Sequence, residues 1–229
     1  MEGPLKEDVT FETGHGAACG IWSRPAEAVA TYVLAHGAGA GMRHVFMKTI
    51  ADALNERRIA TLRYEFLYMS SGSKRPDREP VLLDTVRAAV AFGHQLAPDL
   101  PVFAGGKSMG GRMTSRAAAA APLDVNGIIF IGFPLHPPKR VSRDRAAHLH
   151  DVKPAMLFLQ GTRDDLADLD SIREVTAGLR DAELHVVEGA DHSFHVLKRS
   201  GRTDAEVMNE LVDRIATFVA AHSMPGATR

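Results

Sequence analysis

Short, nearly continuous apolar runs recur along the chain, separated by longer segments in which apolar residues recur every three or four positions. Such runs are typical of parallel strands that are covered on both faces, because neither face then needs polar side chains. The longer segments have the period of amphipathic helices. We predict strands at residues 31–35, 59–64, 102–105, 127–132, 155–160 and 184–188. We predict helices at residues 45–57, 81–96, 109–121, 171–179 and 205–221.

The start of the chain has a different pattern. Residues 9–13 and 18–22 are rich in β-formers and flank a glycine-containing turn, which indicates an antiparallel hairpin. The alternation of strands and helices that follows implies right-handed βαβ crossovers in one sheet. The expected fold is α/β and three-layered, with a mostly parallel eight-stranded sheet, the N-terminal hairpin and helices on both faces. We expect one domain over residues 1–222 and a frayed tail over 223–229.

Two connections are longer than the others, residues 67–80 and 134–154. They contain most of the turn residues and many of the charges. Long connections at the carboxyl edge of a parallel sheet often border a binding site. We therefore expect both connections to lie near the functional site.

Composition narrows the class of protein. The 229 residues, 45% of them hydrophobic and 24% charged, suit one globular domain with a substantial core. A formal net charge of −1 gives no general attraction to nucleic acid or to a membrane, and we expect neither as a partner. The single cysteine, Cys19, excludes an internal disulfide framework. The first eight residues are too polar for a secretory signal, so we expect a cytoplasmic protein.

Residues 104–111 read AGGKSMGG and contain two overlapping motifs. Gly-Lys-Ser is the tail of a phosphate-binding loop, whereas Gly-x-Ser-x-Gly frames a catalytic serine on a sharp turn. A phosphate-binding loop requires a glycine five positions before Gly106, where this chain has Pro101. The residues between them have the pattern of a strand, and the next strand ends without an aspartate to help hold magnesium. The sequence therefore disfavours the phosphate-binding interpretation.

The catalytic-serine interpretation fits the surrounding pattern. A strand precedes the turn at residues 106–110, and a helix follows it. A nucleophile elbow strains the backbone of its serine, so its flanking residues must be small. Gly106 and Gly110 meet that requirement around Ser108. The alternative is a glycine-rich turn whose serine has no catalytic role.

A serine hydroxyl is a poor nucleophile unless a base removes its proton and a carboxylate orients that base. The strand at 155–160 is followed by Gly-Thr-Arg-Asp-Asp, and the strand at 184–188 by Gly-Ala-Asp-His-Ser-Phe. The candidate acids and bases lie in these segments or shortly after them, and they are Asp164, Asp165, Asp168, His192 and His195.

With these motifs the chain resembles the α/β-hydrolase superfamily over nearly its whole length, and in its compactness it is similar to the dienelactone-hydrolase-like and small bacterial serine hydrolases. The resemblance implies Ser108 as nucleophile, His192 as base and Asp164 as the acid. Asp165 and Asp168 remain rivals that could cap the next helix, and His195 competes with His192. Dienelactone hydrolases use a cysteine nucleophile, so their substrate does not carry over to a chain with Ser108.

The segment His-Gly-Ala-Gly-Ala-Gly follows the strand at 31–35. The resemblance implies that the backbone N–H groups of Ala38 and Met109 form an oxyanion hole. We also expect His36, Gly37 and Lys107 to border the substrate. A lysine directly before the serine departs from the family, where an aromatic residue or a histidine is more usual, and the alternative is that Lys107 points into solvent. A dinucleotide site with Glu65 as its acid is the rival interpretation, but the glycine spacing differs from Gly-x-Gly-x-x-Gly and the catalytic motifs stay unexplained.

We therefore expect hydrolysis of an acyl ester or thioester through an acyl-enzyme, with a small-molecule acyl substrate, no cofactor and no metal. A non-catalytic scaffold of the same fold is the alternative. The connection at 134–151 carries Lys139, Arg140, Arg143 and Arg145, and Lys107 adjoins the serine. A positive field there would raise the encounter rate of anions, which gives the hypothesis of an acyl substrate bearing a carboxylate or phosphate. The alternative is a solvated basic cap without a role in selection.

Overall fold

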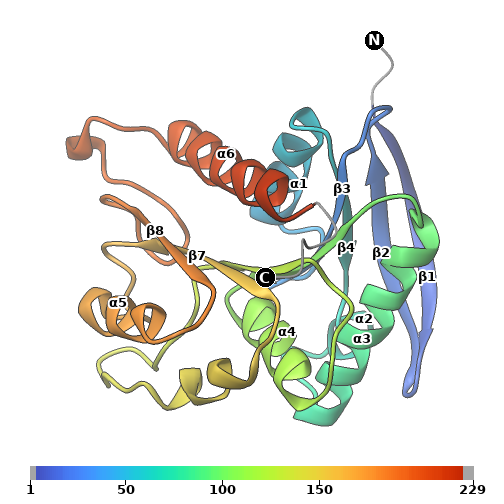
Figure 1. The fold of residues 1–229 in the computed structure, drawn as a ribbon, viewed down its shortest axis with the longest axis horizontal. Coiled ribbons are helices and arrows are strands. Elements are labelled where there is room, and N and C mark those ends of the chain that lie inside the picture. Colours follow the sequence, from blue (N-terminus) through green and yellow to red (C-terminus); the bar gives the residue numbers. More distant parts are fainter. Residues whose placement is uncertain (1–3, 224–229) are drawn as a thin grey trace.

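One eight-stranded sheet runs through the molecule, with the strand order β1-β2-β4-β3-β5-β6-β7-β8 (Figure 1). The structure is a computed structural model that describes residues 4–223. The strands are β1 (Leu5–Thr13), β2 (Gly16–Arg24), β3 (Ala30–Ala35), β4 (Ile59–Tyr64), β5 (Val102–Lys107), β6 (Gly127–Ile131), β7 (Ala155–Gly161) and β8 (Ala182–Val187).

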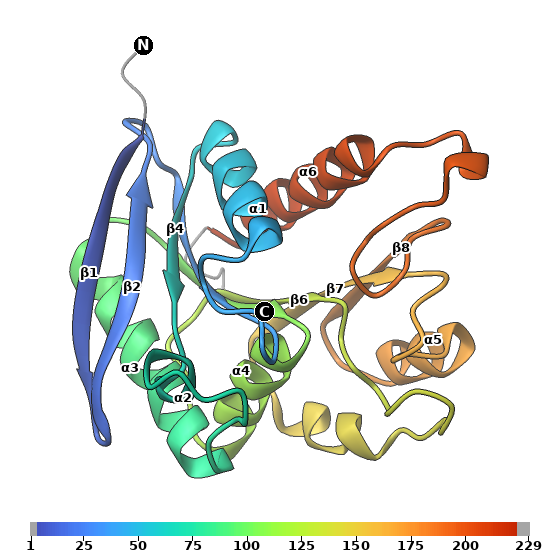
Figure 2. The same cartoon turned by 180° about the vertical axis from the view of Figure 1, so that it is seen from behind.

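Helices cover both faces of this sheet, so the fold has three layers (Figures 1 and 2). The α-helices are α1 (Val45–Glu56), α2 (Leu67–Ser70), α3 (Glu79–Leu96), α4 (Met109–Ala120), α5 (Leu169–Ala177) and α6 (Asp204–His222). Two 3-10 helices are η1 (Asp144–Asp151) and η2 (Lys198–Ser200). Helices α1 and α6 lie together on one face, and α3, α4 and α5 lie on the other.

The strand pairings follow the predicted pattern. β1 pairs antiparallel with β2, and β2 pairs antiparallel with β4, whereas all pairings from β4 to β8 are parallel. Every residue of β3, β4, β6 and β7 is buried, which is why these strands are continuous apolar runs. β8 lies at the edge of the sheet and is only partly buried. The predicted α/β fold class, with its hairpin and two helical layers, is confirmed.

Several elements differ in extent from the prediction. The hairpin strands are longer because their register continues from Leu5–Arg24 to Thr13–Gly16. The connections at 67–80 and 134–154 contain α2 and η1, which are too short to show a helical period. Ser223 is the C-cap of α6, and the rest of the predicted frayed tail lies outside the described residues. None of the helices within residues 4–223 is long and apolar enough to cross a bilayer.

Candidate active site

Ser108 lies on a sharp turn between β5 and α4, at φ 50° and ψ −114°. Two glycines allow this turn. A Cβ at Gly106 would lie 2.1 Å from the Ala35 carbonyl oxygen, and a Cβ at Gly110 would lie 2.7 Å from the His36 carbonyl oxygen. Since no side chain fits in either place, the local sequence holds the strained serine at the carboxyl edge of the sheet.

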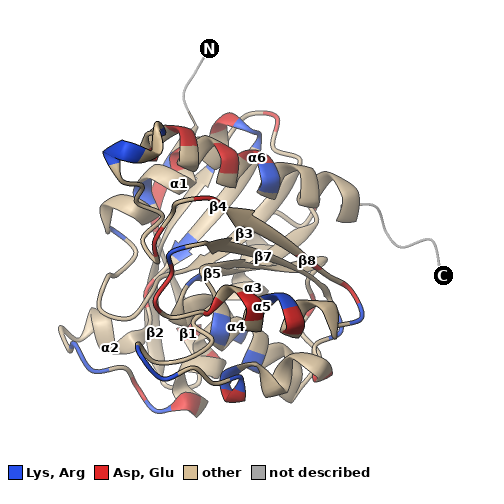
Figure 3. Ribbon diagram, turned by 90° about the vertical axis from the view of Figure 1, so that its left-hand side faces the viewer, with Lys and Arg blue, Asp and Glu red and all other residues tan. Residues whose placement is uncertain are grey.

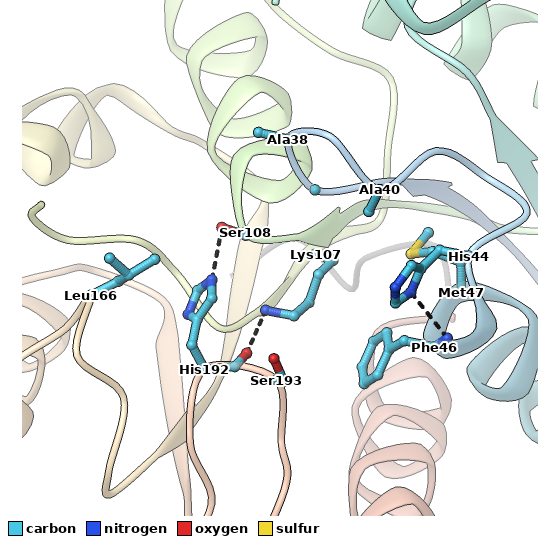
Figure 4. Close-up of a pocket in the computed structure, with 11 residues that line it drawn as sticks. Ala38, Ala40, His44, Phe46, Met47, Lys107, Ser108, Leu166, His192 and Ser193 are labelled. Atoms are coloured by element: carbon cyan, nitrogen blue, oxygen red, sulfur yellow. Dashed lines mark hydrogen bonds between the residues drawn. The ribbon is translucent and has the colours of Figure 1, made fainter. Parts of the chain in front are cut away.

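The turn brings Ser108 against a histidine that is distant in sequence. Ser108 Oγ is 2.9 Å from His192 Nε2 (Figure 4), and His192 Nδ1 is 2.7 Å from Asp164 Oδ2. With Nδ1–H donating to the carboxylate, Nε2 is the acceptor for the serine hydroxyl. Strands β5, β7 and β8 each end in the loop that carries one of these residues, so the sheet itself sets their spacing.

Asp164 has hydrogen-bond partners besides His192. Its side chain is fully buried, Oδ1 accepts from Leu166 N at 2.8 Å, and Oδ2 also accepts from Gln160 Nε2 at 2.5 Å. The other end of that amide is fixed as well, because Gln160 Oε1 accepts from Phe133 N at 3.1 Å. Gln160 was not among the predicted site residues, although a glutamine near the end of an otherwise apolar strand is a visible signal.

The rival residues lie elsewhere. Asp165 is exposed, and Asp168 is the N-cap of α5, where it accepts from Ser171 N at 2.9 Å. His195 pairs with Asp204 at 2.8 Å rather than facing the serine. Among the described residues 4–223, no group of three His, Cys, Asp or Glu side chains is placed to hold a metal ion.

The glycine-rich loop after β3 passes next to Ser108, since a Cβ at Gly37 would lie 3.7 Å from the Ser108 Cβ. His36 is buried behind this loop. Its Nδ1–H donates to the Gly37 carbonyl at 2.7 Å, and its Nε2 accepts from Phe66 N at 3.2 Å. Burial lowers the pKa of His36, which keeps the ring neutral and suited to both contacts. His36 therefore holds the loop in place and does not line the cavity.

A cavity of about 390 Å³ opens beside Ser108. It is lined by Gly37, Ala38, Ala40, His44, Phe46, Met47, Lys107, Ser108, Leu166, His192 and Ser193 (Figure 4). Apolar side chains from the loop after β3 and from α1 form one wall, and the serine and histidine form the other. The lining includes Ala38, Gly37 and Lys107, three of the residues that the sequence analysis placed at the substrate. The size is within the range of small-molecule sites.

No residue of the basic connection at 134–151 belongs to the lining of this cavity, although the sequence suggested a positive field beside the serine. Arg143 pairs with Glu174, and Arg145 Nη1 lies 3.4 Å from the Pro134 carbonyl oxygen. Basic and acidic residues both occur on the outer helices α5 and α6 (Figure 3). The pairing of Arg143 with Glu174 offsets one of the positive charges of this connection, and a sequence does not reveal such a pairing.

Comparison with known proteins identifies the family of the chain and agrees with its fold. The family model described as "Alpha/beta hydrolase domain" matches residues 28–220, and the chain belongs to this family. Dienelactone hydrolase from Anabaena variabilis superposes with a TM-score of 0.78 at 18% identity, covering 97% of this chain and 100% of that one. An a/b serine hydrolase without lid from Xanthomonas campestris has a TM-score of 0.74 at 21% identity, covering 97% and 96%. The esterase domain of a Rhodothermus marinus protein has a TM-score of 0.71 at 16% identity, covering 95% and 99%. The expectation of an α/β hydrolase is confirmed.

Proposed function

We propose that the protein hydrolyses acyl esters of small molecules through a covalent acyl-enzyme, with Ser108, His192 and Asp164 as its catalytic triad. The observation that carries this proposal is the chain of two hydrogen bonds, 2.9 and 2.7 Å long, that ends at Ser108 in the wall of the cavity. One domain over residues 1–222 would contain the whole machinery. The ester class is supported by the names of two structural neighbours, a dienelactone hydrolase and an esterase domain.

In the first half-reaction Ser108 Oγ attacks the ester carbonyl carbon while His192 Nε2 takes the hydroxyl proton. The buried Asp164 carboxylate stabilises the imidazolium that forms, and Nε2 then returns the proton to the leaving alcohol. In the second half-reaction His192 removes a proton from water, which attacks the acyl-enzyme and releases the acid and the free serine.

The oxyanion would be held by the backbone N–H groups of Ala38 and Met109. Met109 is the first residue of α4, where N–H groups lack partners within the helix and the helix dipole favours negative charge. Ala38 lines the cavity on the loop that passes next to Ser108. Within residues 4–223 neither N–H donates a hydrogen bond to another protein group. Removal of one such donor typically costs about 10²–10³ in turnover.

The hypothesis of an anionic acyl group loses most of its support, because the cations of 134–151 lie outside the cavity lining. Lys107 is the one Lys or Arg in the lining formed by the described residues, and its ammonium group donates to the His192 carbonyl oxygen. A comparison of kcat/KM for a neutral ester and its anionic analogue, at low and high salt, tests this preference. An advantage of the anion that shrinks with salt supports it, whereas identical behaviour of the two esters contradicts it.

The proposed activity is tested with a panel of p-nitrophenyl esters and acyl thioesters of graded chain length. The apolar wall of Ala40, Phe46 and Met47 and the modest volume predict highest kcat/KM for short and medium acyl groups. Ser108→Ala should lose about 10⁴–10⁶-fold in turnover while keeping its fold. A non-catalytic scaffold, the alternative from another class, predicts no turnover of any ester and no reaction with a fluorophosphonate.

A further inference from the structure

Lys107 occupies an unusual place for a charged side chain. It is the last residue of β5, directly before the proposed nucleophile, and its side chain is partly buried in the cavity wall. Its ammonium group does not point to solvent. Nζ donates to the backbone carbonyl oxygen of His192 at 2.6 Å (Figure 4) and lies 5.6 Å from the centre of the Phe194 ring. Lys107, next to Ser108 in the chain, is thus hydrogen-bonded to the turn that carries His192.

That turn is strained and needs support. Phe194 has a φ of 63°, a left-handed conformation that a bulky side chain rarely adopts. Asp191 stabilises the turn, because its Oδ1 accepts from Ser193 N at 2.8 Å and from His195 N at 3.0 Å. Among the described residues, Lys107 is the one partner of the His192 carbonyl. Without Lys107, this partly buried carbonyl would lose its hydrogen-bond donor. The turn that carries His192 would then keep the contacts of Asp191 but lose that of Lys107.

Little free space remains around the contact between Lys107 and His192. At Gly132, the residue after β6, an added Cβ would lie 3.2 Å from Lys107 Nζ and 3.4 Å from His192 Cε1. Gly132 also has a φ of 70°, which favours glycine on its own account. The absence of a side chain there lets the ammonium group and the imidazole lie next to each other.

The charges around Lys107 agree with a protonated group at neutral pH. Burial lowers the pKa of Lys107 to about 8, while the carboxylates of Asp164 and Asp191 act in the opposite direction. The imidazoles of His192 and His44 are the other titratable groups at the cavity wall. Above pH 8 the lysine becomes a neutral amine, which still donates but forms a weaker bond than the charge-assisted one.

We propose that Lys107 is a positioning residue: its ammonium group fixes the His192 carbonyl and thereby holds the imidazole between Ser108 and Asp164. This inference rests on the proposed function of the triad. It assigns to Lys107 a role different from substrate binding, which the sequence alone had suggested. A displaced imidazole lowers the rate of proton transfer for every substrate, whereas a lost substrate contact weakens binding of those substrates that carry the matching charge.

The two roles separate in the kinetics of Lys107→Met, which keeps most of the length of the side chain but removes the charge and the donor. For a neutral ester and for its anionic analogue alike, kcat should fall about 10²-fold, the cost of a misplacement of about 1 Å, with KM nearly unchanged. In the wild type, kcat should decline as pH rises through about 8, the pKa of Lys107. This alkaline decline should be absent in Lys107→Met and in Lys107→Arg, because the guanidinium stays charged, and the arginine variant should recover part of kcat.

Lys6→Met is the matched control, since Lys6 pairs with Asp52 and does not line the cavity. It should leave kcat, KM and the pH profile unchanged. The inference is overturned if Lys107→Met raises KM for the anionic ester alone, which would make Lys107 a substrate-binding group. It is also overturned if kcat stays at the wild-type value for both esters, or if the alkaline decline persists without the lysine.

A readout independent of turnover separates this inference from the proposed function. The His192 Nδ1–H proton, shared with Asp164, should give a downfield proton resonance in the wild type that is identified by its loss in His192→Gln. It should broaden or vanish in Lys107→Met and return in Lys107→Arg. If the resonance behaves so in a protein that hydrolyses no ester, the proposed function fails while the positioning role stands. An unchanged resonance in Lys107→Met contradicts the positioning role even in an active enzyme.

Discussion

Replacing Asp164 by asparagine or by alanine should give two different losses of activity, and the hydrogen bonds of Asp164 predict their ratio. Oδ2 accepts from both His192 Nδ1 and Gln160 Nε2, and Oδ1 accepts from Leu166 N. Whichever oxygen becomes an amide nitrogen in Asp164→Asn, it faces an N–H donor. With the nitrogen in place of Oδ2, the bond from Gln160 is lost, and the bond to His192 is kept only if the histidine tautomer inverts and Nε2 no longer accepts from the serine. With the nitrogen in place of Oδ1 only the Leu166 bond is lost.

The second orientation should therefore prevail, and the tautomer should be retained. The variant then loses the negative charge that stabilises the imidazolium. A hydrogen bond to a charged group contributes about 1.5–3 kcal/mol, which corresponds to about 10–150-fold in rate. Asp164→Ala removes the acceptor altogether and should cost about 10⁴-fold, as expected when the acid of a triad no longer fixes its histidine.

Single-turnover and steady-state hydrolysis of an activated ester at pH 7.5 measure both losses. Asp165→Asn is the matched control, because Asp165 is adjacent in sequence but exposed, and it should retain wild-type turnover. Circular dichroism confirms that each variant is folded. Equal losses for the asparagine and alanine variants would refute the orientation argument. Losses below about threefold for both would show that Asp164 does not act in a triad.

Three further predictions concern stability. Gly110→Ala should lower the free energy of unfolding by about 1–3 kcal/mol in urea titrations, because its Cβ would overlap backbone carbonyls, whereas Gly178→Ala should change it by about 0.5 kcal/mol or less. Thr203→Ala should lower it by about 1 kcal/mol, because it removes the capping box of α6, and Thr203→Ser should restore it. The free energy of unfolding should also fall from pH 6.5 toward 4, because burial lowers the pKa of His148 to about 4 and the unfolded chain binds the proton first. His148→Gln should flatten that decrease, and the exposed His150→Gln should not.

The fold was largely predictable because its determinants are local. The parallel strands lie where continuous apolar runs predicted them, since burial on both faces removes the need for polar residues. The glycines around Ser108 marked a strand-to-helix turn for a steric reason that the structure makes explicit. The short helices α2 and η1 were not predictable, because elements of this length depend on tertiary packing rather than on a repeating pattern.

The residues of the candidate site were easier to predict than their contacts. Order along the chain, the loops after strands, and the resemblance to α/β-hydrolases pointed to Ser108, Asp164 and His192, and the structure brings these three side chains together. No sequence pattern links Gln160 to Asp164 or Lys107 to the His192 carbonyl, because both contacts depend on where loops from different strands meet. For the same reason, the charge of the connection at 134–151 suggested a role at the cavity that its actual location does not support.

Under the proposed mechanism, Ser108 is an activated nucleophile that forms a covalent acyl intermediate. The decisive experiment is intact-mass measurement after treatment with a fluorophosphonate, followed by peptide mapping. We expect one adduct per chain, on the peptide that contains Ser108, and no adduct in Ser108→Ala or after prior denaturation. A wild-type protein that stays unmodified, or one modified at another residue with Ser108 free, would contradict it.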